Sequence, residues 1–158
     1  NFPTRLKNLL SKVPETPPKA IQLEVLETSK LSNIKNVSEI MEDCVNLGVT
    51  FAIDDFGTGY SSLTYLRRLP AEVIKIDQSF VRDMLEDLED KTIVIGVIAL
   101  ANSFNRSVIA EGVETVAHGA SLLTLGCELA QGFGVARPMP PKALPTWVEQ
   151  WETKEEWK

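Results

Sequence analysis

The chain has 158 residues, of which 44% are apolar, and this is enough for one globular domain with a buried core. Its formal net charge of −6 argues against a surface that follows the phosphates of duplex nucleic acid, but suits a site for divalent cations. No apolar run reaches membrane-spanning length, no signal peptide is visible, and Cys44 and Cys127 lie in apolar patterns. We therefore expect reduced core thiols, no membrane contact from this segment, and a cytoplasmic location, either alone or as the cytosolic part of a membrane-anchored protein.

Hydrophobic periodicity predicts helices and strands in alternation. Helices end where prolines or glycines follow the apolar pattern, as at Pro14, Gly48, Pro70 and Gly126. In chain order we expect a helix over 2–12, a strand over 21–27, a helix over 33–47, a strand over 49–54, a helix over 63–69, a strand over 73–77, a helix over 90–104, a strand over 107–111, a helix over 116–123, a strand over 129–135 and a helix over 142–151.

The predicted fold class is α/β. Strands that are almost entirely apolar and alternate with helices indicate a parallel sheet covered by helices. Polar residues recur at the strand exits, which favours a (β/α)8 barrel of the TIM type over an open doubly wound sheet. A closed barrel needs eight strands and about 250 residues, whereas the pattern contains five strands. We therefore expect about five βα units of a barrel, with the first three strands absent.

The most informative stretch is Ala52–Ser62, where an apolar run ends in Asp54 and Asp55 and a glycine- and hydroxyl-rich loop follows. Neighbouring side chains of a strand point to opposite faces. The two aspartates can therefore share a site only if the strand ends there and the backbone turns. An isolated pair of this kind would more simply be a helix N-cap beside a glycine turn. Here other strands also end in polar residues, namely Glu24 with Glu27, Lys75, Glu111 with Glu114, and Gln131.

Four motifs together resemble the EAL domain family over essentially the whole chain. They are D-D-F-G-T-G-Y-S-S at 54–62, K-I-D at 75–77, E-G-V-E at 111–114 and Q-G-F at 131–133. Active members of that family hydrolyse the bacterial second messenger cyclic di-GMP to linear pGpG. The E-A-L signature and the metal-binding asparagine of the next strand are absent, so residues 1–158 are expected to be the C-terminal portion of an EAL domain. By itself this portion is expected to be inactive.

The resemblance implies a site for two divalent ions, Mg²⁺ or Mn²⁺, since carboxylate oxygens suit these hard cations. Glu24 and Asp54 would bind the first ion, with Asp54 bridging to the second, and Asp55 and Glu111 would bind the second. Lys75 would orient the attacking water, so that Lys75 and Glu111 are the expected catalytic residues. The alternatives are that the carboxylates are solvated or cap turns, and that Lys75 belongs to a structural ion pair.

The resemblance also implies a supporting shell around this site. Glu27 would anchor the Asp55–Ser62 loop, together with Thr58 and Ser61, and Gln131 and Glu114 would contact the substrate. Glu114 could equally cap a helix beside Thr115. Asp77 is expected to cap a helix that starts at Gln78. His118 is expected to be a surface or packing residue rather than a catalytic one, and Trp147, Trp151 and Trp157 are expected to be core and docking residues.

Two classes of function are consistent with these residues. The first is a metal-dependent cyclic di-GMP phosphodiesterase, and the second is a catalytically inactive module that binds cyclic di-GMP and regulates a neighbouring domain. The presence of all acidic ligands within reach favours the enzyme. A different metal-dependent barrel enzyme, such as an enolase relative, is disfavoured by the D-D-F-G-T-G loop. We also expect a homodimer formed through the Asp55–Ser62 loop region and an upstream GGDEF or sensor domain.

Overall fold

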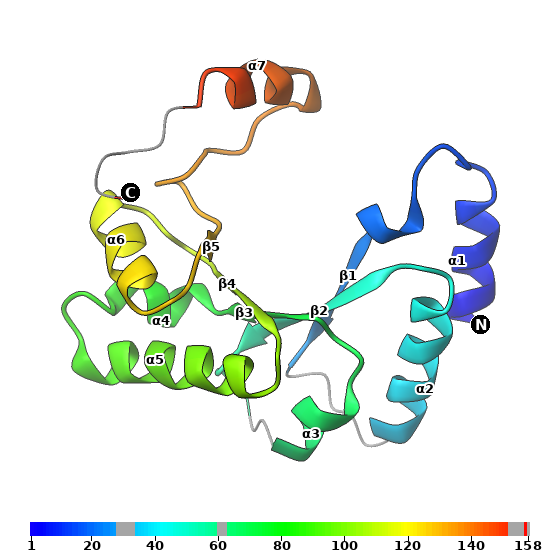
Figure 1. Ribbon diagram of the computed structural model, residues 1–158, viewed down its shortest axis with the longest axis horizontal. Coiled ribbons are helices and arrows are strands. Elements are labelled where there is room, and N and C mark those ends of the chain that lie inside the picture. The colour runs from blue at the N-terminus through cyan, green and yellow to red at the C-terminus, as the bar shows by residue number, and fades with distance from the viewer. Residues whose placement is uncertain (28–33, 60–62, 152–156, 158) are drawn as a thin grey trace. The chain divides into compact units, whose positions relative to one another are not determined.

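The computed structural model describes residues 1–27, 34–59, 63–151 and 157, and each strand in it is followed by at least one helical segment (Figure 1). The strands are β1 (Gln22–Leu26), β2 (Thr50–Phe56), β3 (Val73–Ile76), β4 (Ser107–Ala110) and β5 (Leu129–Ala130). The helices are α1 (Phe2–Leu10), α2 (Ile34–Val45), α3 (Leu63–Arg68), α4 (Gln78–Asp83), α5 (Leu88–Ser103), α6 (Val116–Thr124) and α7 (Leu144–Glu149), with 3-10 turns η1 (Pro18–Ala20) and η2 (Pro141–Ala143).

The strands form one sheet in the order β1-β2-β3-β4-β5, so neighbours in sequence are neighbours in the sheet. β1 runs parallel to β2, with Leu26 opposite Asp54, and β4 runs parallel to β5, with Ala110 opposite Ala130. Consecutive parallel strands connected through helices are the arrangement of a (β/α) barrel. The predicted α/β fold, with about five units of a TIM-like barrel, is therefore confirmed.

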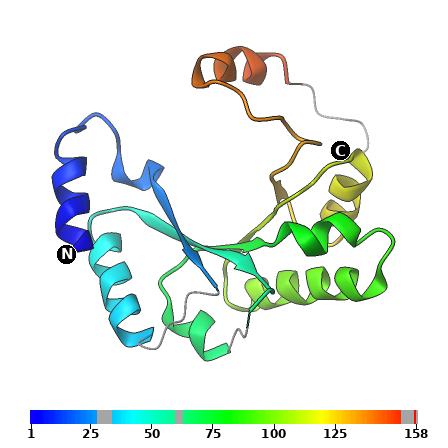
Figure 2. The same ribbon diagram turned by 180° about the vertical axis from the view of Figure 1, so that it is seen from behind.

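The chain divides into two compact units, each with its own apolar core. The first unit comprises residues 1–75 and 101–107, and the second comprises residues 76–100 and 108–158. In the first unit α1 and α2 lie side by side (Figures 1 and 2). The fully or nearly fully buried side chains of its core include Cys44, Phe51, Ile53, Leu66 and Ile74. Those of the second unit include Ile76, Val81, Met84, Val94, Val113, Leu122 and Cys127.

Both cysteines are buried free thiols, as the sequence predicts. Burial raises the pKa of the Cys44 thiol and that of the Cys127 thiol. None of the helices within the described ranges combines the length and the apolar character needed to cross a bilayer.

Near the C-terminus one prediction is wrong and another is correct except for its bounds. The strand expected over 129–135 ends at Ala130, because the chain turns where Gly134 N donates to Val113 O at 2.7 Å. A Cβ at Gly132 would lie 2.3 Å from the Val113 carbonyl oxygen, so the chain passes too close to that backbone for a regular strand of larger residues. The helix expected over 142–151 is instead η2 followed by α7, which ends at Glu149.

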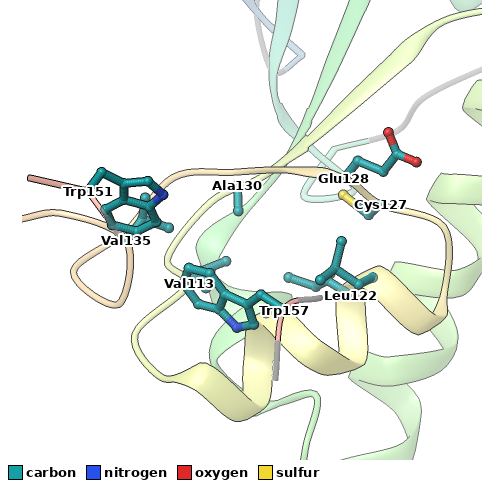
Figure 3. A pocket seen from close by; sticks show the side chains of 10 residues that line it. Val113, Leu122, Cys127, Glu128, Ala130, Val135, Trp151 and Trp157 are labelled. Carbon is teal, nitrogen blue, oxygen red and sulfur yellow. The ribbon is translucent and has the colours of Figure 1, made fainter. Parts of the chain in front are cut away.

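The C-terminal segment of the second unit is attached to α6 by an aromatic contact. The Trp157 indole Nε1 donates to Val116 O at 3.0 Å, and the ring packs on Gly119, where a Cβ would lie 2.5 Å from Nε1. Trp151 lies between Trp147 and Trp157, at ring-centroid distances of 4.9 and 6.1 Å. A pocket of about 250 Å³ remains beside the Trp151 and Trp157 rings, lined also by Val113, Leu122, Cys127 and Glu128 (Figure 3). The tryptophans therefore serve packing and docking, as expected.

Candidate active site

Three neighbouring strands bring Glu24, Asp54 and Lys75 together in the first unit. Lys75 Nζ on β3 lies 2.7 Å from Glu24 Oε1 on β1 and 2.7 Å from Asp54 Oδ1 on β2. The Lys75 side chain is only 7% exposed, against 17% for Asp54 and 48% for Glu24. A buried ammonium group is costly unless carboxylates compensate it. Here the two carboxylates do so, and Glu24 also keeps a face open to solvent.

Asp55 departs from the alternation of the strand on which it lies. Its φ of 53° is in the left-handed region, while β2 continues to Phe56. This conformation costs a non-glycine residue about 1 kcal/mol, although aspartate tolerates it better than most. The turn brings a carboxylate oxygen of Asp55 to within 4.8 Å of one of Asp54. The two aspartates can therefore share a site even though they are adjacent in a strand.

The loop after β2 is held in place by hydrogen bonds to Glu27. Its Oε2 accepts hydrogen bonds from Gly57 N at 2.7 Å and from Gly59 N at 3.3 Å, and Glu27 N donates to Asp54 O at 3.0 Å. Glu27 is 7% exposed, so these bonds to a charged acceptor are shielded from water. A Cβ at Gly59 would lie 3.2 Å from the Glu27 carboxyl carbon, which makes a larger residue there unfavourable. The loop thus fits closely on the carboxylate.

Thr58 binds within the loop rather than to Glu27. Its Oγ1 donates to Asp55 O at 2.9 Å, which closes a tight turn on the residue with the left-handed backbone. Ser61 lies outside the described residues. The hydroxyl contacts expected of these two residues are thus described only for Thr58, and it supports the Asp55 backbone directly.

Glu111 and Gln131 follow neighbouring strands of the second unit. Glu111 comes directly after β4, is partly buried, and its N–H donates to Ile76 O at 3.2 Å. Gln131 comes directly after β5; its N–H donates to Ala110 O at 2.8 Å, and its side chain is exposed. Gly112 has a φ of 70°, and a Cβ there would lie 2.6 Å from that of Gln78, so the turn after Glu111 requires glycine.

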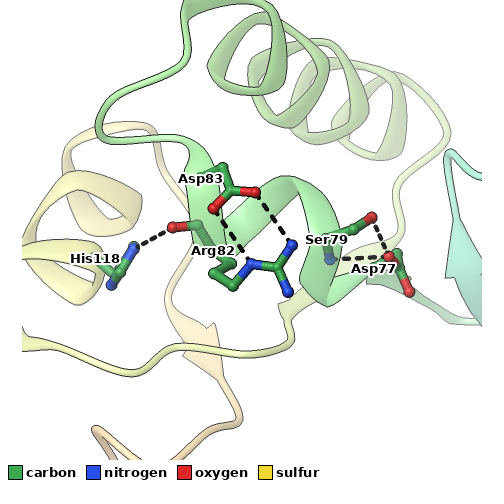
Figure 4. A network of polar contacts seen from close by, with 5 residues as sticks. All are labelled: Asp77, Ser79, Arg82, Asp83 and His118. Carbon is green, nitrogen blue, oxygen red and sulfur yellow. Dashed lines mark hydrogen bonds and ion pairs between the residues drawn. The ribbon is translucent and has the colours of Figure 1, made fainter.

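Glu114 is exposed and does not cap α6. Thr115 is the N-cap, because its hydroxyl accepts a hydrogen bond from the His118 backbone N–H. The capping alternative for Glu114 is therefore wrong. The Asp77 cap is confirmed, since its Oδ1 accepts from Ser79 N at 2.9 Å at the start of α4 (Figure 4).

His118 connects α6 to α4. Its Nε2 lies 3.0 Å from Arg82 O (Figure 4), and its Nδ1 lies 2.8 Å from Thr115 Oγ1. A carbonyl oxygen can only accept, so Nε2 carries the hydrogen and donates it to Arg82 O. His118 is 7% exposed and provides a donor for one of the last carbonyls of a six-residue helix, that of Arg82. Of the two alternatives that the sequence leaves open, surface or packing, the structure shows packing.

The donor set of the first unit fits a hard divalent cation. Glu24, Asp54 and Asp55 offer carboxylate oxygens only, which Mg²⁺, Mn²⁺ and Ca²⁺ prefer over nitrogen or sulfur ligands. The oxygens of Asp54 and Asp55 are close enough to contribute to one site, and the turn that pairs them is fixed by Thr58 and Glu27. A strained backbone at such a position is typical of a functional site.

Comparison with protein families and curated proteins gives consistent matches. A family model described as EAL domain matches residues 1–138. The bifunctional diguanylate cyclase/cyclic di-GMP phosphodiesterase MucR of Pseudomonas aeruginosa is 44% identical over 127 residues, and the cyclic di-GMP phosphodiesterase NbdA of the same organism is 45% identical over 124 residues. These matches cover 80% and 78% of this chain but 18% and 16% of the relatives. The chain thus spans less than a fifth of the length of these curated relatives.

Solved structures give the same result. The PaMucR phosphodiesterase in its c-di-GMP complex has a TM-score of 0.82 at 42% identity, covering 87% of this chain and 56% of that one. The EAL domain of Mycobacterium smegmatis DcpA has a TM-score of 0.88 at 35% identity, covering 97% and 68%. Klebsiella pneumoniae BlrP1 in a manganese/cy-diGMP complex has a TM-score of 0.78 at 32% identity, covering 86% and 35%.

Proposed function

Because the chain belongs to the EAL domain family, we propose that the protein containing it hydrolyses cyclic di-GMP to linear pGpG in a reaction that requires divalent metal ions. The observation that carries this proposal is the cluster of Glu24, Asp54 and Asp55 beside the buried Lys75. Relatives named as cyclic di-GMP phosphodiesterases and a structure solved with cyclic di-GMP support the choice of substrate. A structure solved with manganese supports a divalent metal, and we propose Mg²⁺ or Mn²⁺.

We assign the metal ligands to Glu24, Asp54, Asp55 and Glu111. Bound divalent ions would supply a water with a lowered pKa and would neutralise the charge that builds on the phosphate. The chain's own contribution is to hold the carboxylates in place before the substrate arrives. Lys75 does this for Glu24 and Asp54 through its two 2.7 Å contacts, and the turn at Asp55 does it for the third carboxylate.

Lys75 is proposed to orient the attacking water as well. Its ammonium group has three N–H donors. The contacts to Glu24 and Asp54 hold this group in a fixed position and direct it at the acidic cluster. Glu111 shares the catalytic role as a metal ligand. Glu27, Thr58 and Ser61 are proposed to keep the loop in place, and Gln131 and Glu114 to contact the substrate.

The test is product analysis with the native protein that contains this chain. Cyclic di-GMP should be converted to pGpG in Mg²⁺ or Mn²⁺ and should remain intact in excess EDTA. The 158-residue chain alone should give little product, because it spans only part of the EAL structures that it matches. Binding of cyclic di-GMP without hydrolysis by the native protein would instead identify the regulatory binding module.

Three further assignments are part of this proposal. We propose a cytoplasmic location, a homodimer formed through the Asp55–Ser62 loop region, and an upstream GGDEF or sensor domain in the same polypeptide. Sedimentation of the native protein, with and without cyclic di-GMP, tests the dimer. A monomer under both conditions would contradict it.

A further inference from the structure

Arg106 occupies a fixed position between α5 and β4, in the first unit. Asn105 has a left-handed φ of 53°, and Arg106 N donates to Ala101 O at 3.0 Å, which closes the reversal that ends α5. The next residue, Ser107, donates its N–H to Glu72 O at 3.0 Å and begins β4. The backbone at Arg106 and at the next residue is therefore hydrogen-bonded, so the Cα from which the Arg106 side chain extends is held in a fixed position.

The Arg106 side chain caps the C-terminal end of α3. Its Nη2 donates to Leu66 O and, at 2.8 Å, to Leu69 O. The last carbonyls of a helix have no partner within the helix. Leu66 and Leu69 are 0% and 2% exposed, so water is a poor substitute as a donor. A cation at this end also interacts favourably with the helix dipole.

α3 needs such external support. A six-residue helix is too short to be stable on its own and depends on tertiary contacts. A second side chain, Ser38 on α2, donates from Oγ to Arg68 O at 2.9 Å. Burial lowers the pKa of the Arg106 guanidinium group, and within the described ranges its buried Nη1 has no acceptor. The desolvation of this cation is therefore offset mainly by its bonds to the two carbonyls.

The helix that Arg106 holds is the downstream end of the loop that begins at Asp55. Only residues 60–62 separate Gly59 from Leu63, the first residue of α3. Upstream, Glu27 accepts from Gly57 and Gly59. We infer that Arg106 is a positioning residue for the Asp55 loop: it stabilises α3, the element that follows the loop, while Glu27 binds the loop itself at Gly57 and Gly59. The importance of this for catalysis rests on the proposed function.

The test compares Arg106→Met with Arg67→Met, an exposed arginine on α3 itself. Both variants remove one positive charge and replace it with an unbranched apolar side chain. Amide hydrogen exchange and ¹H–¹⁵N spectra are measured on the native protein that contains this chain. Arg106→Met should accelerate exchange at Gly57 and Gly59 by about tenfold or more and shift their amide signals, because their bonds to Glu27 open more often when α3 is loose. Arg67→Met should leave these amides unchanged.

A purely local cap would give a different pattern. If Arg106→Met accelerates exchange in α3 but leaves Gly57 and Gly59 as in Arg67→Met, the inference is wrong. It is also wrong if the amides of Val113 and Gln131 in the second unit accelerate by the same factor, since this would be global destabilisation. If Arg106→Met does not fold, Arg106→Lys, which keeps the charge and its donors, must show a smaller acceleration confined to the loop and α3.

This experiment is independent of the proposed function. Amide exchange requires neither metal nor cyclic di-GMP, so a negative result would remove the role of Arg106 and leave the phosphodiesterase proposal intact. Conversely, a native protein without hydrolytic activity would leave the mechanical link between Arg106 and the loop intact.

Discussion

At the scale of single residues, Lys75 is the residue for which we expect a role both in the stability of the fold and in the hydrolytic reaction. Lys75→Ala should lower kcat of the native protein by about 100-fold or more while cyclic di-GMP affinity stays largely intact, because the proposed role acts on the attacking water. It should also cost about 2 kcal/mol of stability, less than for a fully buried pair because Glu24 is half exposed. Steady-state kinetics, ligand titration and thermal unfolding measure the three effects.

Lys35→Ala is the matched control for Lys75→Ala. Lys35 also pairs with a glutamate, Glu39, but both side chains are exposed and 3.9 Å apart, so its removal should be almost neutral. If Lys75→Ala instead abolishes binding while the turnover of bound ligand is unchanged, Lys75 is a binding residue.

Glu27 offers a second test at this scale, because its two oxygens differ. Oε2 accepts both loop bonds, whereas the buried Oε1 has no hydrogen-bond partner in the part of the chain that the structure describes. Glu27→Gln can keep an acceptor at Oε2 and should cost about 1 kcal/mol, and Glu27→Ala should cost about 2–3 kcal/mol. Exchange at Gly57 and Gly59 should rise in that order. Equal exchange in Glu27→Ala and in the exposed control Glu39→Ala would contradict the anchoring role.

At the scale of elements, the docking of the C-terminal segment on α6 depends on the lack of a side chain at Gly119. Gly119→Ala would place a Cβ 2.5 Å from Trp157 Nε1 and should displace the indole, at a cost of about 1–3 kcal/mol. Gly96→Ala is the matched control, because a Cβ there meets nothing within 4 Å in the α5 helix. It should stabilise the chain by about 0.5–1 kcal/mol. Tryptophan emission should shift only for Gly119→Ala, and identical spectra for the two variants would exclude this docking mode.

The elements also show what the sequence can and cannot predict. Apart from α4, which only the Asp77 cap indicates, the helices and strands up to α6 follow from hydrophobic spacing, and Asp54 with Asp55 can be recognised because two carboxylates end an apolar run. The turn at Gly132 cannot be predicted, because it arises from the close approach of Val113, a contact between distant segments. The position of Arg106 on the α3 carbonyls is likewise tertiary, and its sequence context is only a helix end followed by a strand.

For the whole molecule, the two buried thiols report on the two units separately. Cys44 belongs to the first unit and is 0% exposed, and Cys127 belongs to the second and is 3% exposed. Burial also raises the pKa of both thiols, which lowers the population of reactive thiolate at neutral pH. Alkylation of the native chain at pH 8 should be about 100-fold slower than in denaturant, as measured by mass spectrometry of each cysteine peptide. If either thiol of the native chain is alkylated as fast as in denaturant, the core of the unit that contains it is accessible to solvent.

Stability should fall at alkaline pH for the same reason. In the unfolded chain the thiols lose their protons near their ordinary pKa of 9.0, whereas in the folded chain the raised pKa keeps them protonated. The unfolded state then binds fewer protons, so the free energy of unfolding decreases as pH rises through that value. Cys127→Ala should reduce this slope in denaturant titrations between pH 8 and 10. An unchanged slope would mean that other groups account for it.

The central claim is that the carboxylates gathered beside Lys75 bind divalent metal for the hydrolysis of cyclic di-GMP. The most direct measurement is the initial rate of pGpG formation by the native protein as a function of Mn²⁺ concentration, for the wild type and for Asp55→Asn. We expect no product without metal, a saturable rise for the wild type, and a rate at least about 100-fold lower for Asp55→Asn at the same Mn²⁺ concentration. Metal-independent hydrolysis, or a wild-type rate in Asp55→Asn, would contradict it.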